Sequence, residues 1–128
     1  MESLIRDIKL APEGRKKIEW VSNFMPALNS LREEFKASHK FEGKTVVVSV
    51  HLEAKTAYLS TILKEAGADV IVTGSNPLST QDDVAAALVD MGLTVYAWHD
   101  CTEEEYFMFL NKALDHKPHI IIDDGGIW

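Results

Sequence analysis

The segment from Thr45 to Ala66 constrains the fold of this chain more than any other. Its first part, Thr45 to Val50, is a β-branched run with almost no polar side chain, typical of a strand covered on both faces. Apolar residues then recur at the spacing of a helix packed on a sheet: Leu59, Ile62, Leu63 and Ala66. The ionisable residues His51, Glu53 and Lys55 lie between the two patterns. In open parallel sheets this junction of strand and helix is where ligands bind.

The rest of the chain alternates between the same two patterns. Helical spacing covers residues 12–36, 81–91 and 102–117, and short β-branched segments cover 69–73, 93–98 and 119–123. Pro26 interrupts the first helical pattern, which predicts two helices that meet near Met25 or one sharply kinked helix. We therefore predict one domain, residues 1–128, with a three-layer α/β/α fold. Its mostly parallel, flavodoxin- or Rossmann-like sheet is preceded by N-terminal helices.

Local signals refine this prediction. Thr102 and Glu105 have the spacing of a capping box, and Ser79 or Thr80 is expected to cap the helix over 81–91. The aromatic residues are most simply explained as core, with two of them widening the buried stripe of the first helix: Trp20, Phe24, Trp98 and Tyr106.

Composition excludes several classes of partner. The formal net charge is -7, from 13 basic and 20 acidic residues, so the chain lacks the basic surface that nucleic acid or anionic lipid requires. The single cysteine, Cys101, gives no sign of an oxidising compartment. No apolar run reaches a membrane-spanning length and no secretory signal begins the chain, so we expect a cytoplasmic protein. His51, His99 and Cys101 lack the spacing of a metal site, and no metal is expected.

The predicted strand ends bring polar residues to one edge of the sheet. His51 could be an acid/base group there, or a hydrogen-bonded structural histidine. Asp123 and Asp124 are adjacent on a strand, so they point to opposite faces and only one of them faces a ligand. Glu53 and Lys55 offer an acceptor beside a donor, although a solvated ion pair explains them equally well.

The loop between the second predicted strand and the next helix is the other candidate. Its side chains can hydrogen-bond the hydroxyls of a ligand, but the same composition is ordinary in turns and caps. The candidates in this loop are Asn76, Ser79, Thr80 and Gln81.

Several motifs together resemble the N-terminal, substrate-binding part of the adenosylhomocysteinase family. The matching stretches, in the family's order, are GRKKIEWVSNFMPAL, VHLEAKTA, GSNPLSTQDDVAAAL, VYAW and IIDDGG. The resemblance implies an NAD-dependent enzyme that splits S-adenosylhomocysteine into adenosine and homocysteine, and that is commonly a tetramer.

The resemblance also implies roles for individual residues. His51 is similar to the family's acid/base histidine, and Asp124, the second aspartate of DDGG, to its catalytic aspartate. The remaining matched positions are expected to contact the substrate: Glu53, Lys55, Thr56, Asn76, Ser79, Thr80 and Gln81.

The chain departs from the common family pattern at two positions that contact the purine base of the substrate in the family. Many members have threonine and glutamine or glutamate at the positions of Glu53 and Lys55, which touch the base. Lysine only donates and ionised glutamate only accepts, and hypoxanthine presents an acceptor at O6 beside a donor at N1. We therefore hypothesise that S-inosylhomocysteine is bound as well as, or better than, the adenosyl compound.

A second departure concerns the cofactor. No glycine-rich dinucleotide motif follows any predicted strand, so the resemblance implies a substrate-binding part without its NAD-binding domain, inactive alone. A free-standing flavodoxin-like module that binds nucleosides or regulates, without catalysis, is the alternative.

Overall fold

The computed structural model describes residues 3–39, 41–74 and 80–123. The helical elements are η1 (Ile8–Leu10, a single 3-10 turn), α1 (Ala11–Ser22), α2 (Pro26–Ser38), α3 (Ala54–Glu65), α4 (Asp82–Asp90) and α5 (Glu103–Leu114). The strands are β1 (Thr45–Ser49), β2 (Asp69–Thr73), β3 (Thr94–Tyr96) and β4 (Ile120–Asp123).

The four strands form one parallel sheet in the order β3-β2-β1-β4. β1 therefore lies inside the sheet, with β2 on one side and β4 on the other. Val46, Val47 and Val48 are at most 1% exposed, as expected for a strand with helices on both faces. The predicted α/β architecture and the buried first strand are confirmed.

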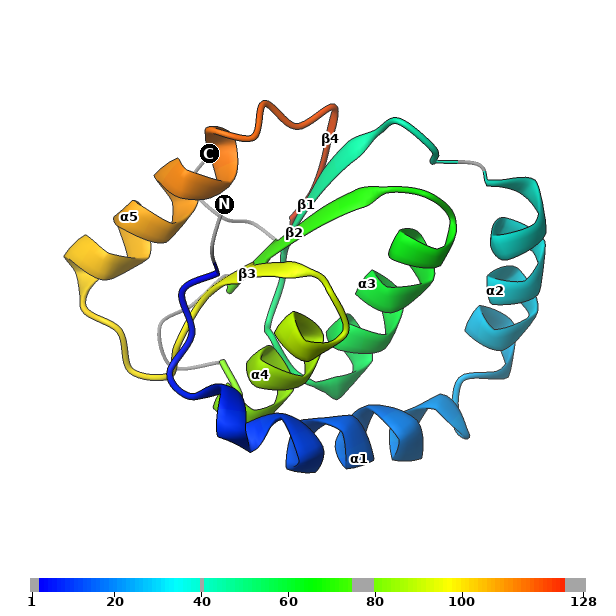
Figure 1. Ribbon diagram of the computed structural model, residues 1–128, viewed down its shortest axis with the longest axis horizontal. Coiled ribbons are helices and arrows are strands. Elements are labelled where there is room, and N and C mark those ends of the chain that lie inside the picture. Colours follow the sequence, from blue (N-terminus) through cyan, green and yellow to red (C-terminus); the bar gives the residue numbers. More distant parts are fainter. Residues whose placement is uncertain (1–2, 40, 75–79, 124–128) are drawn as a thin grey trace.

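Helices cover the two faces of the sheet unequally, as Figure 1 shows. α3 and α4 lie on one face, where alternate strand residues such as Val46, Val70 and Val95 join the larger core cluster. α5 lies on the other face, over Val47 and Ile71. α1 packs across the outside of α3 and α4, and α2 packs on α3, so the N-terminal helices add a further layer to the first face.

The predicted break at Pro26 is confirmed as two separate helices. α1 ends at Ser22, and Pro26 is the first residue of α2, where its missing N–H costs no helical hydrogen bond. The predicted capping box is also present: the Thr102 hydroxyl accepts from the Glu105 amide at 3.1 Å, and the Glu105 carboxylate accepts from the Thr102 amide at 2.8 Å.

Two details of the sequence prediction were wrong. Trp20 and Phe24 are 66% and 65% exposed, because α1 contacts its neighbours through the flank that carries Gly14, Ile18 and Val21. The N-cap of α4 is Gln81, whose side chain makes no capping hydrogen bond. Aspartates in the first turn of α4 provide the negative charge that favours a helix N-terminus.

Candidate functional site

The carboxyl edge of the sheet has a topological switch point between β1 and β4. From β1 the chain proceeds through α3 to β2 on one side, and it returns from β3 through α5 to β4 on the other. Ser49 of β1 is in register with Asp123 of β4, and His51 follows two residues beyond Ser49. Loops diverge at such a point and leave a crevice for a ligand. Asp124 follows Asp123 in the chain but lies outside the described residues.

The loop after β1 is tied to the start of α4. The Gln81 amide donates to the carbonyl of Leu52 at 2.9 Å, and Leu52 is fully buried beneath this contact. His51 is exposed, and its carbonyl accepts from the Glu53 amide at 2.9 Å. The loop after β1 is therefore fixed by backbone hydrogen bonds. Asn76 and Ser79, the other predicted loop residues, lie outside the described residues.

A cleft of about 480 Å³ lies between α1 and the start of α3. One wall carries Glu53, Ala54 and Lys55, and Gln81 adjoins them. Part of the opposite wall is Trp20. The volume falls within the range of small-molecule pockets, roughly 300 to 1,000 Å³. Three of the predicted substrate residues thus share one cavity, two of them charged with opposite sign.

Two other predicted contact residues are buried away from this cleft. Thr56 is 8% exposed in the first turn of α3, and Thr80 is 4% exposed. The Thr80 carbonyl faces Nδ1 of His99 at 3.1 Å. Because a carbonyl only accepts, Nδ1 of His99 must carry a proton. Neither threonine is among the residues that line the cleft.

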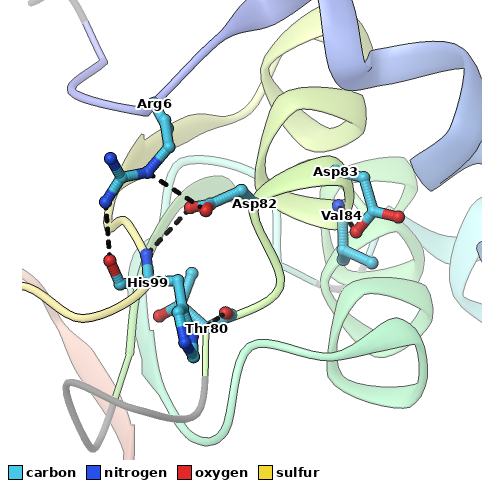
Figure 2. Close-up of polar contacts among 6 residues, drawn as sticks. All are labelled: Arg6, Thr80, Asp82, Asp83, Val84 and His99. Atoms are coloured by element: carbon cyan, nitrogen blue, oxygen red, sulfur yellow. Dashed lines mark hydrogen bonds and ion pairs between the residues drawn. The ribbon is translucent and has the colours of Figure 1, made fainter.

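A polar cluster that the sequence did not reveal holds the start of α4 (Figure 2). The Asp82 carboxylate accepts from the His99 amide at 2.8 Å and pairs with Nε of Arg6 at 3.2 Å. Arg6 also donates to the His99 carbonyl at 2.7 Å. The cluster joins the N-terminal arm, the loop after β3 and the residues beside Thr80 (Figure 2). Arg6, Asp82 and His99 are 17 to 93 positions apart in the chain, so no local sequence motif predicts the cluster.

The helix N-termini at this edge do not fit the pyrophosphate of a dinucleotide. Glu53 is the N-cap of α3, Asp82 and Asp83 open α4, and α5 begins with three glutamates. Dinucleotide folds present backbone N–H groups and a positive helix end to the phosphates, and carboxylates in those positions repel them. The described residues therefore offer NAD no phosphate site.

The described residues also give little support to other chemistries. They contain no group of three His, Cys, Asp or Glu side chains that could hold a metal ion. Burial raises the pKa of the Cys101 thiol, and Glu105 raises it further, which disfavours the reactive thiolate. Within residues 3–39, 41–74 and 80–123, no helix is long and apolar enough to cross a membrane.

Comparison with known proteins identifies the family. Residues 2–127 match the family described as S-adenosyl-L-homocysteine hydrolase. The chain belongs to that family. The family predicted from the motifs is therefore confirmed.

Individual relatives carry two different names. An S-inosyl-L-homocysteine hydrolase of Methanocaldococcus jannaschii is 56% identical over 121 residues, which are 94% of this chain and 29% of the relative. An adenosylhomocysteinase of Pyrococcus abyssi is 55% identical over 122 residues, 95% of this chain and 29% of the relative. The adenosylhomocysteinase of Thermotoga maritima is 55% identical over 113 residues, 88% and 28% of the two chains. This chain thus spans less than a third of the length of these relatives.

Proposed function

We propose that this chain is the substrate-binding part of a hydrolase that splits a nucleosidyl-homocysteine thioether, with S-inosylhomocysteine as the preferred substrate. The observation that carries the proposal is that Glu53 and Lys55 line one cleft of nucleoside size, at the start of the helix that follows β1. The family membership of residues 2–127 gives the reaction class.

The charges of the two side chains suit a hypoxanthine edge. The ammonium of Lys55 donates to O6, and the carboxylate of Glu53 accepts from N1–H. Such charge-assisted hydrogen bonds are about twice as strong as neutral ones. Adenine requires the opposite assignment, with Glu53 on the 6-amino group and Lys55 on N1. The adenosyl compound is the second candidate substrate, because relatives of equal similarity carry either name.

The remaining roles follow from family likeness. His51 is proposed as the acid/base group near C5' of the ribose, and Asp124 as the catalytic carboxylate. In the family, bound NAD supplies oxidation at C3'. The described residues do not fit its phosphates, so we propose that this chain binds the nucleoside and does not turn it over alone.

The purine preference is tested with a single substitution. Inosine and adenosine are titrated into the chain by calorimetry, before and after Lys55→Gln. On this proposal, losing the charged hydrogen bond to O6 lowers inosine affinity by about 10-fold or more, and adenosine affinity falls by less. Lys16→Gln is the matched control, because Lys16 lines the α1 wall of the same cleft. An adenosine preference that survives Lys55→Gln overturns the inosyl assignment.

A regulatory or flavodoxin-like module is the competing function class. Titration with NAD and FMN separates the two, since the proposal predicts nucleoside binding and no flavin binding. Tight FMN binding without nucleoside binding overturns the enzymatic assignment.

A further inference from the structure

We propose that the indole of Trp20 is the surface on which the purine ring of the substrate stacks. The inference rests on the proposed function, and adds to it a specificity-determining residue from α1. It begins from an anomaly: Trp20, in the last turn of a packed helix, leaves 66% of its surface exposed.

The chemistry of the cleft suits a flat ring with one polar edge. Apolar surface comes from Trp20, Val21 and Ala54, while Glu53 and Lys55 supply an acceptor and a donor. A purine has two apolar faces and a polar rim, so it can lie on the indole while its edge meets the charged pair. Aromatic side chains are the usual platform for nucleobases, because every base has a π-face.

A second exposed aromatic ring, that of Phe24 just beyond the end of α1, lies against the indole. The rings of Trp20 and Phe24, four residues apart, have centroids 4.6 Å apart and planes tilted by 48°. Phe24 is 65% exposed as well, but it does not line the cleft. The two aromatics therefore differ in the feature that matters here, which makes Phe24 an internal control.

The separation of the two cleft walls is fixed by the packing of α1. Gly14 brings the α1 backbone so close to α4 that an added Cβ would lie 1.9 Å from the Asp83 carbonyl oxygen. Lys17 pairs with the Asp83 carboxylate at 2.7 Å, one turn before Trp20. The loop that carries Glu53 is held to α4 through the Gln81 amide. Both walls are thus attached to the start of α4. A cleft that is held in this way before the ligand arrives loses less conformational entropy on binding.

The experiment compares Trp20→Ala, Trp20→Phe and Phe24→Ala. Inosine is titrated into the 128-residue chain, and affinity is measured by calorimetry. We expect Trp20→Ala to weaken binding by about 10-fold, Trp20→Phe to retain most of the affinity, and Phe24→Ala to change it less than about 2-fold. In NMR spectra, stacking moves the H2 and H8 resonances of inosine upfield, and this shift disappears in Trp20→Ala.

The outcomes separate this inference from the proposed function. If the unmodified chain does not bind inosine, or Lys55→Gln has no effect, the proposed function fails and this inference fails with it. If Lys55→Gln weakens binding and Trp20→Ala does not, only the stacking role of Trp20 is overturned. A lower melting temperature for Trp20→Ala with unchanged inosine affinity also overturns it, because the indole then serves polypeptide packing.

Discussion

The face of the sheet under α3 and α4 is covered twice, first by those helices and then by α1 and α2, whereas α5 is the only described helix on the opposite face. On the first face, α3 and α4 expose no large apolar side chain. On the second, Phe107 and Leu114 of α5 remain 40% and 41% exposed. Burial of apolar surface is the main source of stability, so the two faces contribute unequally. The candidate cleft lies on the doubly covered side, between α1 and the start of α3.

Two buried hydroxyls add to this contrast. Ser49 and Thr73 are in register at the carboxyl ends of β1 and β2, and both are fully buried. Side chains alternate along a strand, so they point to the α5 face with Val47 and Ile71. Neither hydroxyl has a hydrogen-bond partner among the described residues. The face with less apolar packing is therefore also the one with unmatched polar groups.

The largest effect is expected from Gly14→Ala, which disturbs the packing of α1 on α4, on the doubly covered face. A Cβ at this position would lie 1.9 Å from the Asp83 carbonyl oxygen and 2.9 Å from Cβ of Ala87. Backbone cannot rotate away as a flexible side chain would, so α1 must move off α4. We expect unfolding in urea to show a loss of about 3 kcal/mol or more.

Gly43→Ala is the control for that substitution. Gly43 has a φ of +79° but nothing within 4 Å of an added Cβ, so only backbone strain is expected, about 1 to 2 kcal/mol. Equal losses for the two variants would contradict the close packing of α1 on α4.

Phe109→Ala tests the packing of α5 on the opposite face of the sheet. Phe109 is 2% exposed and packs edge-on against Trp98 at 4.6 Å between centroids. Its truncation is expected to cost about 3 kcal/mol and to speed amide hydrogen exchange in α5 before α1 and α4. Phe107→Ala, on the same helix but exposed, should change stability by less than about 0.5 kcal/mol. Uniform loss of protection across the chain would show that the two faces unfold as one unit.

Thr73→Val sharpens the comparison with a gain in stability. Replacing a buried, unmatched hydroxyl by a methyl group of the same shape removes a desolvation penalty, so thermal unfolding should show about 1 kcal/mol more stability. Thr61→Val is the matched control, because the buried Thr61 hydroxyl donates to the Tyr58 carbonyl at 2.7 Å. That variant should lose about 1 kcal/mol. A loss for Thr73→Val would mean that its hydroxyl is hydrogen-bonded in solution.

The smallest effect concerns the cluster around Asp82. Arg6 is half-exposed, so Arg6→Ala should cost less than about 1 kcal/mol, and the cost should fall as salt is added. Amide resonances of Thr80 and Gln81 should nevertheless move, because Arg6 holds the segment that carries them. Lys16→Ala, which breaks only an exposed pair with Glu13, should leave those resonances unchanged.

Much of the fold was predictable because its signals are local. The β-branched run before His51, the proline at residue 26 and the pair of Thr102 and Glu105 each determine structure within a few residues. The third strand is shorter than predicted, Thr94–Tyr96 instead of residues 93–98. Its edge position explains this, since only β2 pairs with it over its full length.

The rest depends on contacts between distant segments. Helical spacing could not tell which flank of α1 faces its neighbours, and so Trp20 and Phe24 were wrongly assigned to the core. The shared cleft of Glu53 and Lys55 with α1 likewise arises from packing across some 40 positions. The roles of His51 and Asp124 stay predictions, and both come from family likeness.

The two edge strands of the sheet, β3 and β4, differ in whether another segment pairs with their outer side. Leu4 of the N-terminal arm donates to Val95 and accepts from Ala97, at 2.8 and 2.9 Å, so the arm seals the outer side of β3. No described segment pairs with the outer side of β4, where Ile120 and Ile121 are 37% and 40% exposed. An unsealed strand is a template for another. Among the described strands, β4 is therefore the border at which a further strand would pair, next to the strand that leads to His51.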